Sequence, residues 1–248
     1  MKFKSYFIAP FIFQATIWRI IMRPFFYYFG RLQVSGLENL HGIKGPVIFA
    51  ANHPSEIDAI ILPLALPLWS RFMPLFYVVR EPKYYQDPYF KWRRFLYLGW
   101  VFKLLGAFPI RSGAHDYALS LKNHVQILND GGSICIFPEG VLSRGGVIGE
   151  AHGGVGYLAL ATGATVVPVY FGGMDTVSGK SFFSRTSSFR TLIGAPLTAV
   201  DVLPADLEPA SIEACKTVAA AVLARVQQMQ HAGSRQPAVR TQKYTYRI

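Results

Sequence analysis

Short, mainly apolar stretches recur along this chain of 248 residues, and each is too short to be a typical helix. Proline, glycine or asparagine bounds most of them, and they are rich in valine, isoleucine and phenylalanine, which favours strands buried on both faces. We expect strands at residues 47–51, 75–80, 108–111, 133–137, 165–171 and 189–194. Buried strands of this kind belong to parallel sheets, so they restrict the chain to folds in which helices cover a sheet.

Helical patterns lie between and after these strands. Apolar residues spaced three and four apart predict helices over residues 115–129 and 212–229, and residues 153–162 suit a third helix. The alternation of strands and helices predicts an α/β fold: a single layered domain with a mixed, largely parallel sheet flanked by helices.

Both ends of the chain differ from this predicted domain, which spans residues 31–230. Residues 231–248 contain four basic and no acidic side chains, which predicts a mobile tail able to contact anionic lipid. Residues 1–30 hold an uncharged stretch of 14 residues, shorter than the roughly 20 that cross a bilayer. We expect residues 1–30 to form membrane-attachment helices in one leaflet, with Arg19 and Arg23 extended to the headgroups; a single tilted span is the alternative.

Charge and composition favour a membrane surface as a partner. Residues 1–111 hold 14 basic against 5 acidic side chains, out of a net charge of +11 for the whole chain. The basic residues are mixed with aromatic ones, as in "YFKWRRFLYLGWVFKLL" (89–105), which suits the headgroup–acyl boundary better than nucleic acid. We therefore expect membrane lipids and no nucleic acid as partners; a soluble enzyme with many apolar residues is the alternative.

Two cysteines, Cys135 and Cys215, lie in an apolar run and on a helical face, outside any CxxC pattern. Buried free thiols are the expected state, which is consistent with a reducing compartment. Together with the basic surface, this predicts a protein at the cytoplasmic face of a membrane, the inner membrane in a bacterium.

A polar motif follows the first buried strand. "NHPSEID" begins where residues 47–51 end, so His53 is expected at the carboxyl edge of the sheet, where α/β proteins keep their sites. Pro54 suits the first turn of a helix, which would place Asp58 about one turn in and within reach of the imidazole. Such a contact fixes one tautomer of His53 and leaves the other nitrogen as a base. The alternative is a histidine that caps a helix and a solvated aspartate.

No enzyme nucleophile accompanies this pair in the sequence. A G-x-S-x-G elbow and zinc-ligand spacings are both absent from the chain, so a substrate hydroxyl could serve as nucleophile and no metal is expected. Glu139 and Gly140 follow another strand and could orient a polar ligand or form a plain turn. Arg111 could hold a phosphate with two parallel bonds and Lys103 could act as a point charge, or both could face lipid headgroups.

One rival motif is present. Residues 154–159, "GVGYLA", match a dinucleotide-binding fingerprint, and Asp175 lies about 20 residues further on. That fingerprint must follow a strand directly, whereas the loop-like "RGGVIGEAHG" precedes it here. The context therefore disfavours dinucleotide binding.

Four sequence blocks, in order over roughly residues 30–195, resemble the glycerolipid acyltransferases, the group that contains 1-acylglycerol-3-phosphate acyltransferase. "NHPSEID" resembles their NHxxxxD signature, "GAFPIR" their second block, "FPEG" with a later serine their third, and "VVPVYF" their fourth. The resemblance implies that His53 deprotonates an acceptor hydroxyl, that Asp58 orients His53, and that the oxygen attacks the thioester of acyl-CoA or acyl-carrier protein. It also implies an acceptor site built from Lys103, Arg111, Glu139 and Gly140.

Two departures from the family pattern concern the acceptor. The third block often reads FPEGTRS, but Val141 and Leu142 replace its Thr and Arg here, with Arg144 as the nearest substitute. A Phe-Lys pair is also lost, and His152 stands near the lysine's place.

We expect an O-acyltransferase of phospholipid biosynthesis. Its foremost acceptor is 1-acyl-sn-glycerol 3-phosphate, with acyl-CoA or acyl-carrier protein as co-substrate and no other cofactor. Alternatives are another lyso-lipid, such as a glycolipid or aminolipid, and a non-catalytic lipid-binding protein. The oligomeric state is left open.

Overall fold

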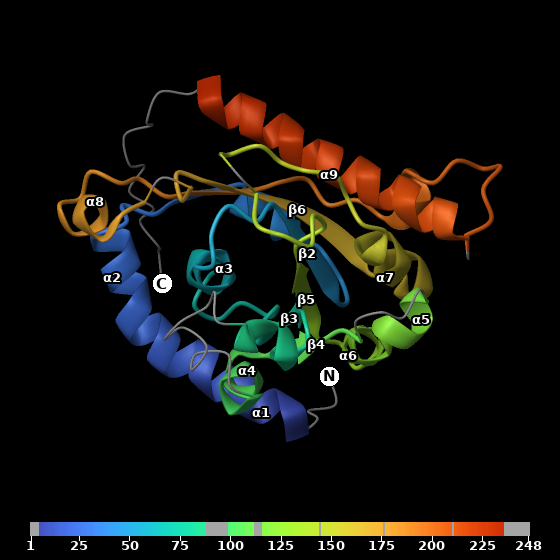
Figure 1. Ribbon diagram of the computed structural model, residues 1–248, viewed down its shortest axis with the longest axis horizontal. Helices are drawn as coiled ribbons and strands as arrows, with labels where there is room; N and C mark the ends of the chain where they lie inside the picture. The colour runs from blue at the N-terminus through green and yellow to red at the C-terminus, as the bar shows by residue number, and fades with distance from the viewer. Residues whose placement is uncertain are drawn as a thin grey trace.

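A seven-stranded sheet of order β1-β7-β6-β2-β5-β3-β4 forms the framework of the molecule (Figure 1). The computed structural model describes residues 5–87, 99–111, 116–143, 145–175, 177–209 and 211–235. Neighbouring strands are parallel except for β6 and β7, so the expected mixed, largely parallel sheet is confirmed. The strands are β1 (Gln33–Ser35), β2 (Val47–Ala51), β3 (Leu75–Val79), β4 (Ala107–Pro109), β5 (Ser133–Ile136), β6 (Thr165–Gly172) and β7 (Arg190–Ile193).

Helices cover both faces of this sheet (Figure 1). Helices α2, α3, α4 and α8 pack on one face of the sheet, and α6, α7 and α9 pack on the opposite face. The helical elements are α1 (Ser5–Ile12), η1 (Phe13–Met22), α2 (Arg23–Tyr28), η2 (Leu37–Leu40), α3 (Asp58–Ala65), η3 (Pro82–Gln86), α4 (Gly99–Leu105), α5 (Tyr117–Ser120), α6 (Lys122–Asn129), α7 (Gly154–Thr162), α8 (Gly179–Phe183), η5 (Ala199–Asp201) and α9 (Ile212–Arg235). The helix expected over 115–129 is thus two helices, separated at Leu121.

Strand β2 is central, and its side chains alternate between two cores. Phe49 packs with the α3 side of the sheet, whereas Ile48 and Ala50 pack with α6, α7 and α9. Because both faces are buried, every residue of β2 is apolar and inaccessible to solvent. The polar residues that follow β2 are therefore positioned by a strand that is fixed on both sides.

Helix α3 contains a proline, and a strand of the sheet supplies the hydrogen bond that this proline cannot donate. Pro63 lacks an amide hydrogen, so the carbonyl of Ala59 cannot accept the usual bond from the residue four positions later. The hydroxyl of Tyr77 on β3 donates to that carbonyl instead, at 2.6 Å. This bond also ties α3 to the sheet.

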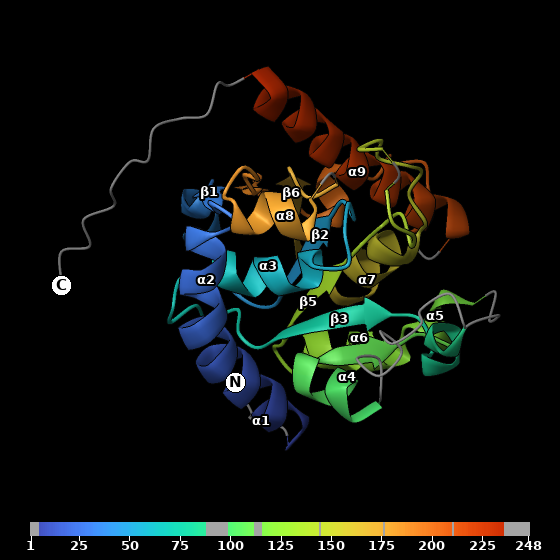
Figure 2. The same cartoon turned by 60° about the vertical axis from the view of Figure 1, so that its left-hand side comes forward.

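The N-terminal helix is an integral part of this core. Elements α1, η1 and α2 run continuously past α3 and α4 (Figure 2). The buried side chain of Gln14 bonds the backbone of β3 at its first residue: Oε1 accepts from Leu75 N and Nε2 donates to Leu75 O, each at 2.8 Å. Nε2 also donates to Leu105 O at 3.0 Å. Residues 1–30 were expected to be a separate attachment segment, but residues 5–28 complete the fold.

Arg19 contradicts our expectation that it reaches lipid headgroups. Only 1% of its surface is exposed, and its guanidinium donates to backbone carbonyls at the end of α3. Arg23, half-buried, donates to Leu66 O at 3.2 Å. The reason lies in the π-helical winding of η1, whose hydrogen bonds join residues five apart. This winding brings Gln14 and Arg19 to the same inward side, whereas an α-helix would set them about 0.4 turn out of line.

The outward side of this helix carries no charge among the side chains that the structure describes. Its exposed residues recur every few positions and are Ser5, Ile8, Ala9, Phe11, Ile12, Thr16, Ile20, Ile21, Pro24, Tyr27 and Tyr28. The helix Ser5–Tyr28, 24 residues long, is also the one described helix with the length and apolar character to cross a bilayer. We refer below to these exposed residues as the uncharged stripe.

A buried histidine on α6 predicts acid sensitivity. His124 is inaccessible to solvent, its Nε2 lies 3.0 Å from Phe108 O, and burial lowers its pKa from 6.5 to about 4. Between these two pH values the unfolded chain binds a proton that the folded chain does not, so the free energy of unfolding falls as the pH falls. At about 1.4 kcal/mol per pKa unit, the loss attributable to His124 is about 3 kcal/mol.

Urea unfolding at pH 7, 6, 5 and 4 would measure this loss. His124→Gln should flatten the dependence of stability on pH relative to wild type, whatever its effect at pH 7. Equal slopes for the two proteins would show that His124 is not the responsible group.

Candidate active site

The loop after β2 is clamped to the neighbouring strand before it reaches His53. The buried side chain of Asn52 bonds both backbone groups of Phe171 on β6: Oδ1 accepts from the amide at 2.7 Å and Nδ2 donates to the carbonyl at 2.9 Å. Asn52 thereby extends the pairing of β2 with β6 by one residue through its side chain. The backbone of His53 starts from this fixed point, at the carboxyl edge of the sheet.

His53 and Asp58 are in contact as expected. Nδ1 of His53 lies 3.1 Å from Oδ2 of Asp58, and the same oxygen accepts from Ser55 N at 2.9 Å. The helix begins at Asp58, not at Pro54, because residues 54–57 form turns. The contact therefore spans an irregular loop closed by the carboxylate, and not one turn of a helix.

Solvent access differs between the two partners. Asp58 is fully buried, which raises the pKa of its carboxyl, while the hydrogen bond and the charge of His53 oppose that rise. The imidazole is 22% exposed and stacks on Phe137, with ring centroids 3.9 Å apart. Stacking and the Nδ1 contact fix the ring plane, so Nε2 is the nitrogen available to a substrate.

Glu139 has a different place from the one expected. It is buried, and its carboxylate accepts hydrogen bonds from His53 N (3.1 Å), Ser143 Oγ (2.8 and 2.9 Å) and Gly149 N (2.8 Å). Ser143 N in turn donates to His53 O at 2.8 Å. Both oxygens of Glu139 are thus engaged by protein groups, and this residue joins the backbone of His53 to Ser143 and Gly149.

Gly140 supplies a sharp turn directly after Glu139. Its φ of 66° favours glycine, and a Cβ there would lie 3.0 Å from the ring of His152. This turn brings the backbone of Gly140 close to His152, which is exposed.

Sequence reasoning missed Arg80 and the structural role of Ser143. Arg80 directly follows β3, and its Nη2 donates to Gly140 O at 3.0 Å while its guanidinium lies 4.5 Å from the ring centroid of Tyr84. A basic residue at the end of an apolar strand was the available signal. Since β3 neighbours β5 in parallel, Arg80 and Gly140 emerge at the same edge.

The other predicted acceptor residues do not all converge on this edge. Arg111 lies two residues past the carboxyl end of β4 and is exposed, which places it at the edge that carries Arg80. Lys103 lies on α4, before the amino end of β4, and therefore at the opposite edge of the sheet. The strand expected at residues 108–111 is β4, and it separates the two residues. Arg144 lies outside the described residues.

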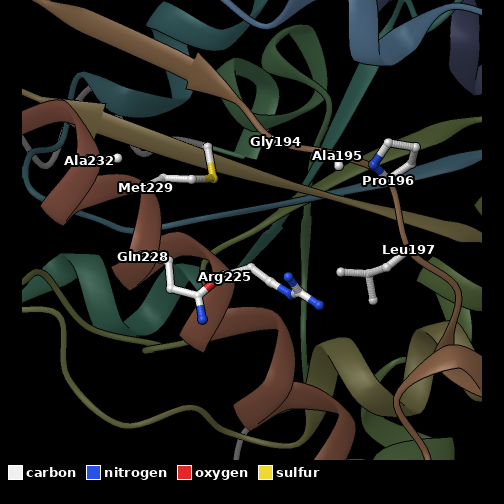
Figure 3. A pocket seen from close by; sticks show the side chains of 8 residues that line it. All are labelled: Gly194, Ala195, Pro196, Leu197, Arg225, Gln228, Met229 and Ala232. Carbon is white, nitrogen blue, oxygen red and sulfur yellow. The ribbon is translucent and has the colours of Figure 1, made fainter.

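Other kinds of site find less support in the described part of the chain. Within it, no group of three or more His, Cys, Asp or Glu side chains could hold a metal ion. A cavity of about 380 Å³ lies between α9 and residues 194–197, with Arg225 and Met229 pointing into it from α9 (Figure 3). Its lining includes none of the residues that surround His53.

The glycine-rich fingerprint is explained by packing. A Cβ on Gly156 would lie 2.0 Å from the carbonyl oxygen of Cys215, so this glycine permits α7 and α9 to touch. A loop, not a strand, precedes α7. The segment therefore lacks the geometry of a dinucleotide site.

The arrangement provides a base without an enzyme nucleophile. An imidazole with one nitrogen held by a buried carboxylate and the other open can remove a proton from a hydroxyl. The hydroxyl of Ser143, whose backbone amide donates to His53 O, is instead bonded to Glu139. The nucleophile would accordingly come from the substrate.

Residues 31–172 match the Acyltransferase family. The chloroplastic 1-acyl-sn-glycerol-3-phosphate acyltransferase of Arabidopsis thaliana is 27% identical over 188 residues, which cover 75% of this chain and 48% of that protein. The lyso-ornithine lipid O-acyltransferase of Pseudomonas aeruginosa is 28% identical over 126 residues, 51% of this chain and 43% of that protein. The chain spans about half the length of the curated relatives it matches.

A solved structure shows the same fold. The crystal structure of the 1-acyl-sn-glycerophosphate acyltransferase from Thermotoga maritima superposes with a TM-score of 0.61 over 90% of this chain and 81% of that one. Sequence identity between the two chains is 18%, so this likeness concerns the fold.

The contacts of Glu139 predict a structural penalty for a minimal change. Glu139→Gln replaces one accepting oxygen with an amide nitrogen and removes the negative charge of a buried group that binds His53 N, Ser143 Oγ and Gly149 N. Bonds to charged groups contribute about 1.5–3 kcal/mol each, so we expect at least about 2 kcal/mol of destabilisation in urea unfolding. Glu150→Gln, an exposed neighbour on the same loop, serves as the control. Similar stability of the two variants would contradict the role given to Glu139.

Proposed function

This chain belongs to the Acyltransferase family, and we propose that it transfers a fatty acyl group from acyl-CoA or acyl-carrier protein to the hydroxyl of a lyso-lipid. The observation that carries this proposal is the His53–Asp58 contact at the carboxyl edge of the sheet, which leaves Nε2 to a substrate, with no hydrogen bond between His53 and a hydroxyl among the described residues. A base without its own nucleophile suits a reaction in which the acceptor hydroxyl attacks.

The residues divide the work as follows. Asp58 accepts the Nδ1 hydrogen and holds the imidazole in the tautomer whose Nε2 is basic. Nε2 takes the proton of the acceptor hydroxyl as its oxygen attacks the thioester carbonyl. The C–S bond then breaks, the thiolate leaves, and protonated His53 returns the proton to sulfur. An ester replaces the thioester, and no acyl-enzyme forms.

The foremost acceptor is 1-acyl-sn-glycerol 3-phosphate. Arg80 and Arg111 follow neighbouring parallel strands at the edge that carries His53, and two guanidinium groups suit a phosphate. An aminolipid acceptor is the alternative, because Val141, Leu142 and Val147 expose apolar side chains on the loop after Glu139. The similarity to a lyso-ornithine lipid O-acyltransferase favours testing this alternative.

The uncharged stripe supports attachment to a membrane. A helix with an uncharged, mainly apolar outward side and its arginine and glutamine side chains turned into the protein can lie in the plane of the lipid boundary. Leu68 and Trp69 follow α3 beside this helix, where Leu68 O accepts from Arg19, and Trp69 is 96% exposed. Indole rings favour the boundary between headgroups and acyl chains. We infer a monotopic enzyme at the cytoplasmic face.

Acyl transfer by detergent-extracted protein tests the reaction. With radiolabelled acyl-CoA or acyl-carrier protein, we expect transfer to 1-acyl-sn-glycerol 3-phosphate within a panel that includes lyso-ornithine lipid and a lyso-glycolipid. His53→Ala should lower the rate by about 10²–10⁴, and Asp58→Asn should also be severe because it favours the wrong tautomer. His41→Ala, an exposed histidine at the end of η2, should leave the rate unchanged.

Different results would correct different parts of the proposal. Transfer to the aminolipid but not to the phosphate acceptor would show that Arg80 and Arg111 do not serve to bind an acceptor phosphate. Full activity of folded His53→Ala, or a labelled acyl-enzyme trapped with donor alone, would refute the mechanism.

Vesicle sedimentation tests the attachment. Ile20→Ser combined with Ile21→Ser removes two exposed side chains from the uncharged stripe. Burial of an isoleucine contributes about 1.5–3 kcal/mol, so partitioning to anionic vesicles should fall at least about tenfold. The matched control combines Val200→Ser and Ile212→Ser, two exposed aliphatic residues of η5 and α9. An equal fall in partitioning for both double variants would show that the uncharged stripe is not the surface that contacts the membrane.

A further inference from the structure

We propose that Arg19 is a positioning residue for acyl transfer: it fixes the end of α3 to the lipid-facing helix and thereby sets the position of Asp58 at the start of α3. The inference rests on the proposed function. It assigns a task to a buried cation that the reaction itself does not use.

The contacts of Arg19 are directed at one structural feature. Nε and Nη2 donate to Pro63 O at 3.2 and 3.1 Å, Nη2 also donates to Leu66 O at 3.4 Å, and Nη1 donates to Leu68 O. These carbonyls belong to the last turn of α3 and the segment that follows it, where a helix leaves carbonyl groups without internal partners. Arg19 therefore caps α3 from a different element.

Helix α3 is suited to transmit this constraint. Ile61, Leu62, Leu64 and Ala65 are fully buried, and Tyr77 holds the carbonyl of Ala59. The helix is 8 residues long, so its two ends are about 12 Å apart at 1.5 Å per residue. An axial shift at the Arg19 end would move Asp58 with it and alter the 3.1 Å contact with His53.

The charge of Arg19 fits the same task. The carboxyl end of a helix carries partial negative charge, which a cation stabilises. Burial lowers the pKa of Arg19 to about 10, so the group remains charged at neutral pH. Each hydrogen bond of its guanidinium goes to a backbone carbonyl, not to a carboxylate. Burial of a cation costs free energy of folding, and the benefit of Arg19 here is that it fixes the end of α3.

The other end of the connection is also fixed. One π-helical turn before Arg19, Gln14 bonds both backbone groups of Leu75. Since Leu75 begins β3, the lipid-facing helix is held to the sheet at Gln14 and to α3 at Arg19. Lipid attachment and the position of Asp58 thus share one rigid element.

Four full-length proteins test this inference: wild type, Arg19→Met, Arg19→Lys and Arg23→Met. Arg23 is the matched control, because it lies on the same helix four positions later and makes one bond to α3, to Leu66 O. For each protein we would measure kcat and KM in the acyl-transfer assay, partitioning to anionic vesicles, and amide hydrogen exchange across α3. The kcat values are normalised to the folded fraction.

We expect Arg19→Met to lower kcat about 10- to 100-fold, because small misplacements far from the chemistry have effects of this size. KM and vesicle partitioning should change less than about twofold, and amide exchange should rise in α3. Arg19→Lys, which keeps the charge and can bond fewer carbonyls, should recover part of kcat. Arg23→Met, which removes one bond to the same helix end, should change kcat and amide exchange in α3 less than Arg19→Met does.

Two results would overturn the inference. One is a fall in vesicle partitioning with unchanged kcat in Arg19→Met, which is the behaviour of an arginine that reaches headgroups. The other is a kcat of Arg19→Met no lower than that of Arg23→Met, since a merely stabilising residue leaves folded molecules fully active.

The experiment also gives an answer if Arg19→Met does not fold or if wild type is inactive. If Arg19→Met does not fold, the comparison of Arg19→Lys with Arg23→Met decides by the same criteria. If wild type transfers no acyl group to any acceptor, the proposed function fails, while exchange in α3 still reports whether Arg19 holds this helix.

Discussion

His53 is held between two buried carboxylates, and the arrangement of the site follows from this. Its ring contacts Asp58, and its backbone amide donates to Glu139. The two acids come from loops that follow β2 and β5, which pair in parallel at the centre of the sheet. Because each acid also binds backbone amides of its surroundings, neither loop can shift without breaking charged hydrogen bonds in a buried place. The imidazole is thus oriented before a substrate arrives, which is the condition for efficient proton transfer.

Sequence reasoning succeeded where the cause was local. The strand β2 is recognisable because burial on both faces removes every polar residue from it. The contact of His53 with Asp58 spans five positions, so the motif itself brings the two side chains together. The stacking of Phe137 on His53 and the bond of His53 N to Glu139 depend on which strands are neighbours, and a single sequence does not state this order.

The expected positions of Lys103 and Arg19 differed from the structure for a related reason: both depend on contacts between segments that are distant in the sequence. Lys103 and Arg111 are close in the chain, but a parallel strand between them sends them to opposite edges of the sheet. Arg19 interrupts an apolar stretch, and hydropathy offers headgroups as the natural destination for such a charge. The structure provides another one, because the end of α3 leaves carbonyls that a guanidinium can satisfy inside the protein. The π-helical winding that turns Arg19 inward has no signature in the sequence that we could identify.

Pro63 and Tyr77 illustrate how such distant relations limit the ways in which this chain can vary. The proline removes one amide hydrogen from α3, and a single hydroxyl on β3 replaces it at the carbonyl of Ala59. Phenylalanine at position 77 would leave that carbonyl buried and unpaired for as long as proline stays at position 63. Any other residue at 63 would bring an amide hydrogen back and make the hydroxyl redundant. The effect of a substitution at either position therefore depends on the residue at the other. If Pro63 is replaced first, the carbonyl of Ala59 keeps a partner when Tyr77 is replaced later; if Tyr77 is replaced first, the intermediate lacks that hydrogen bond.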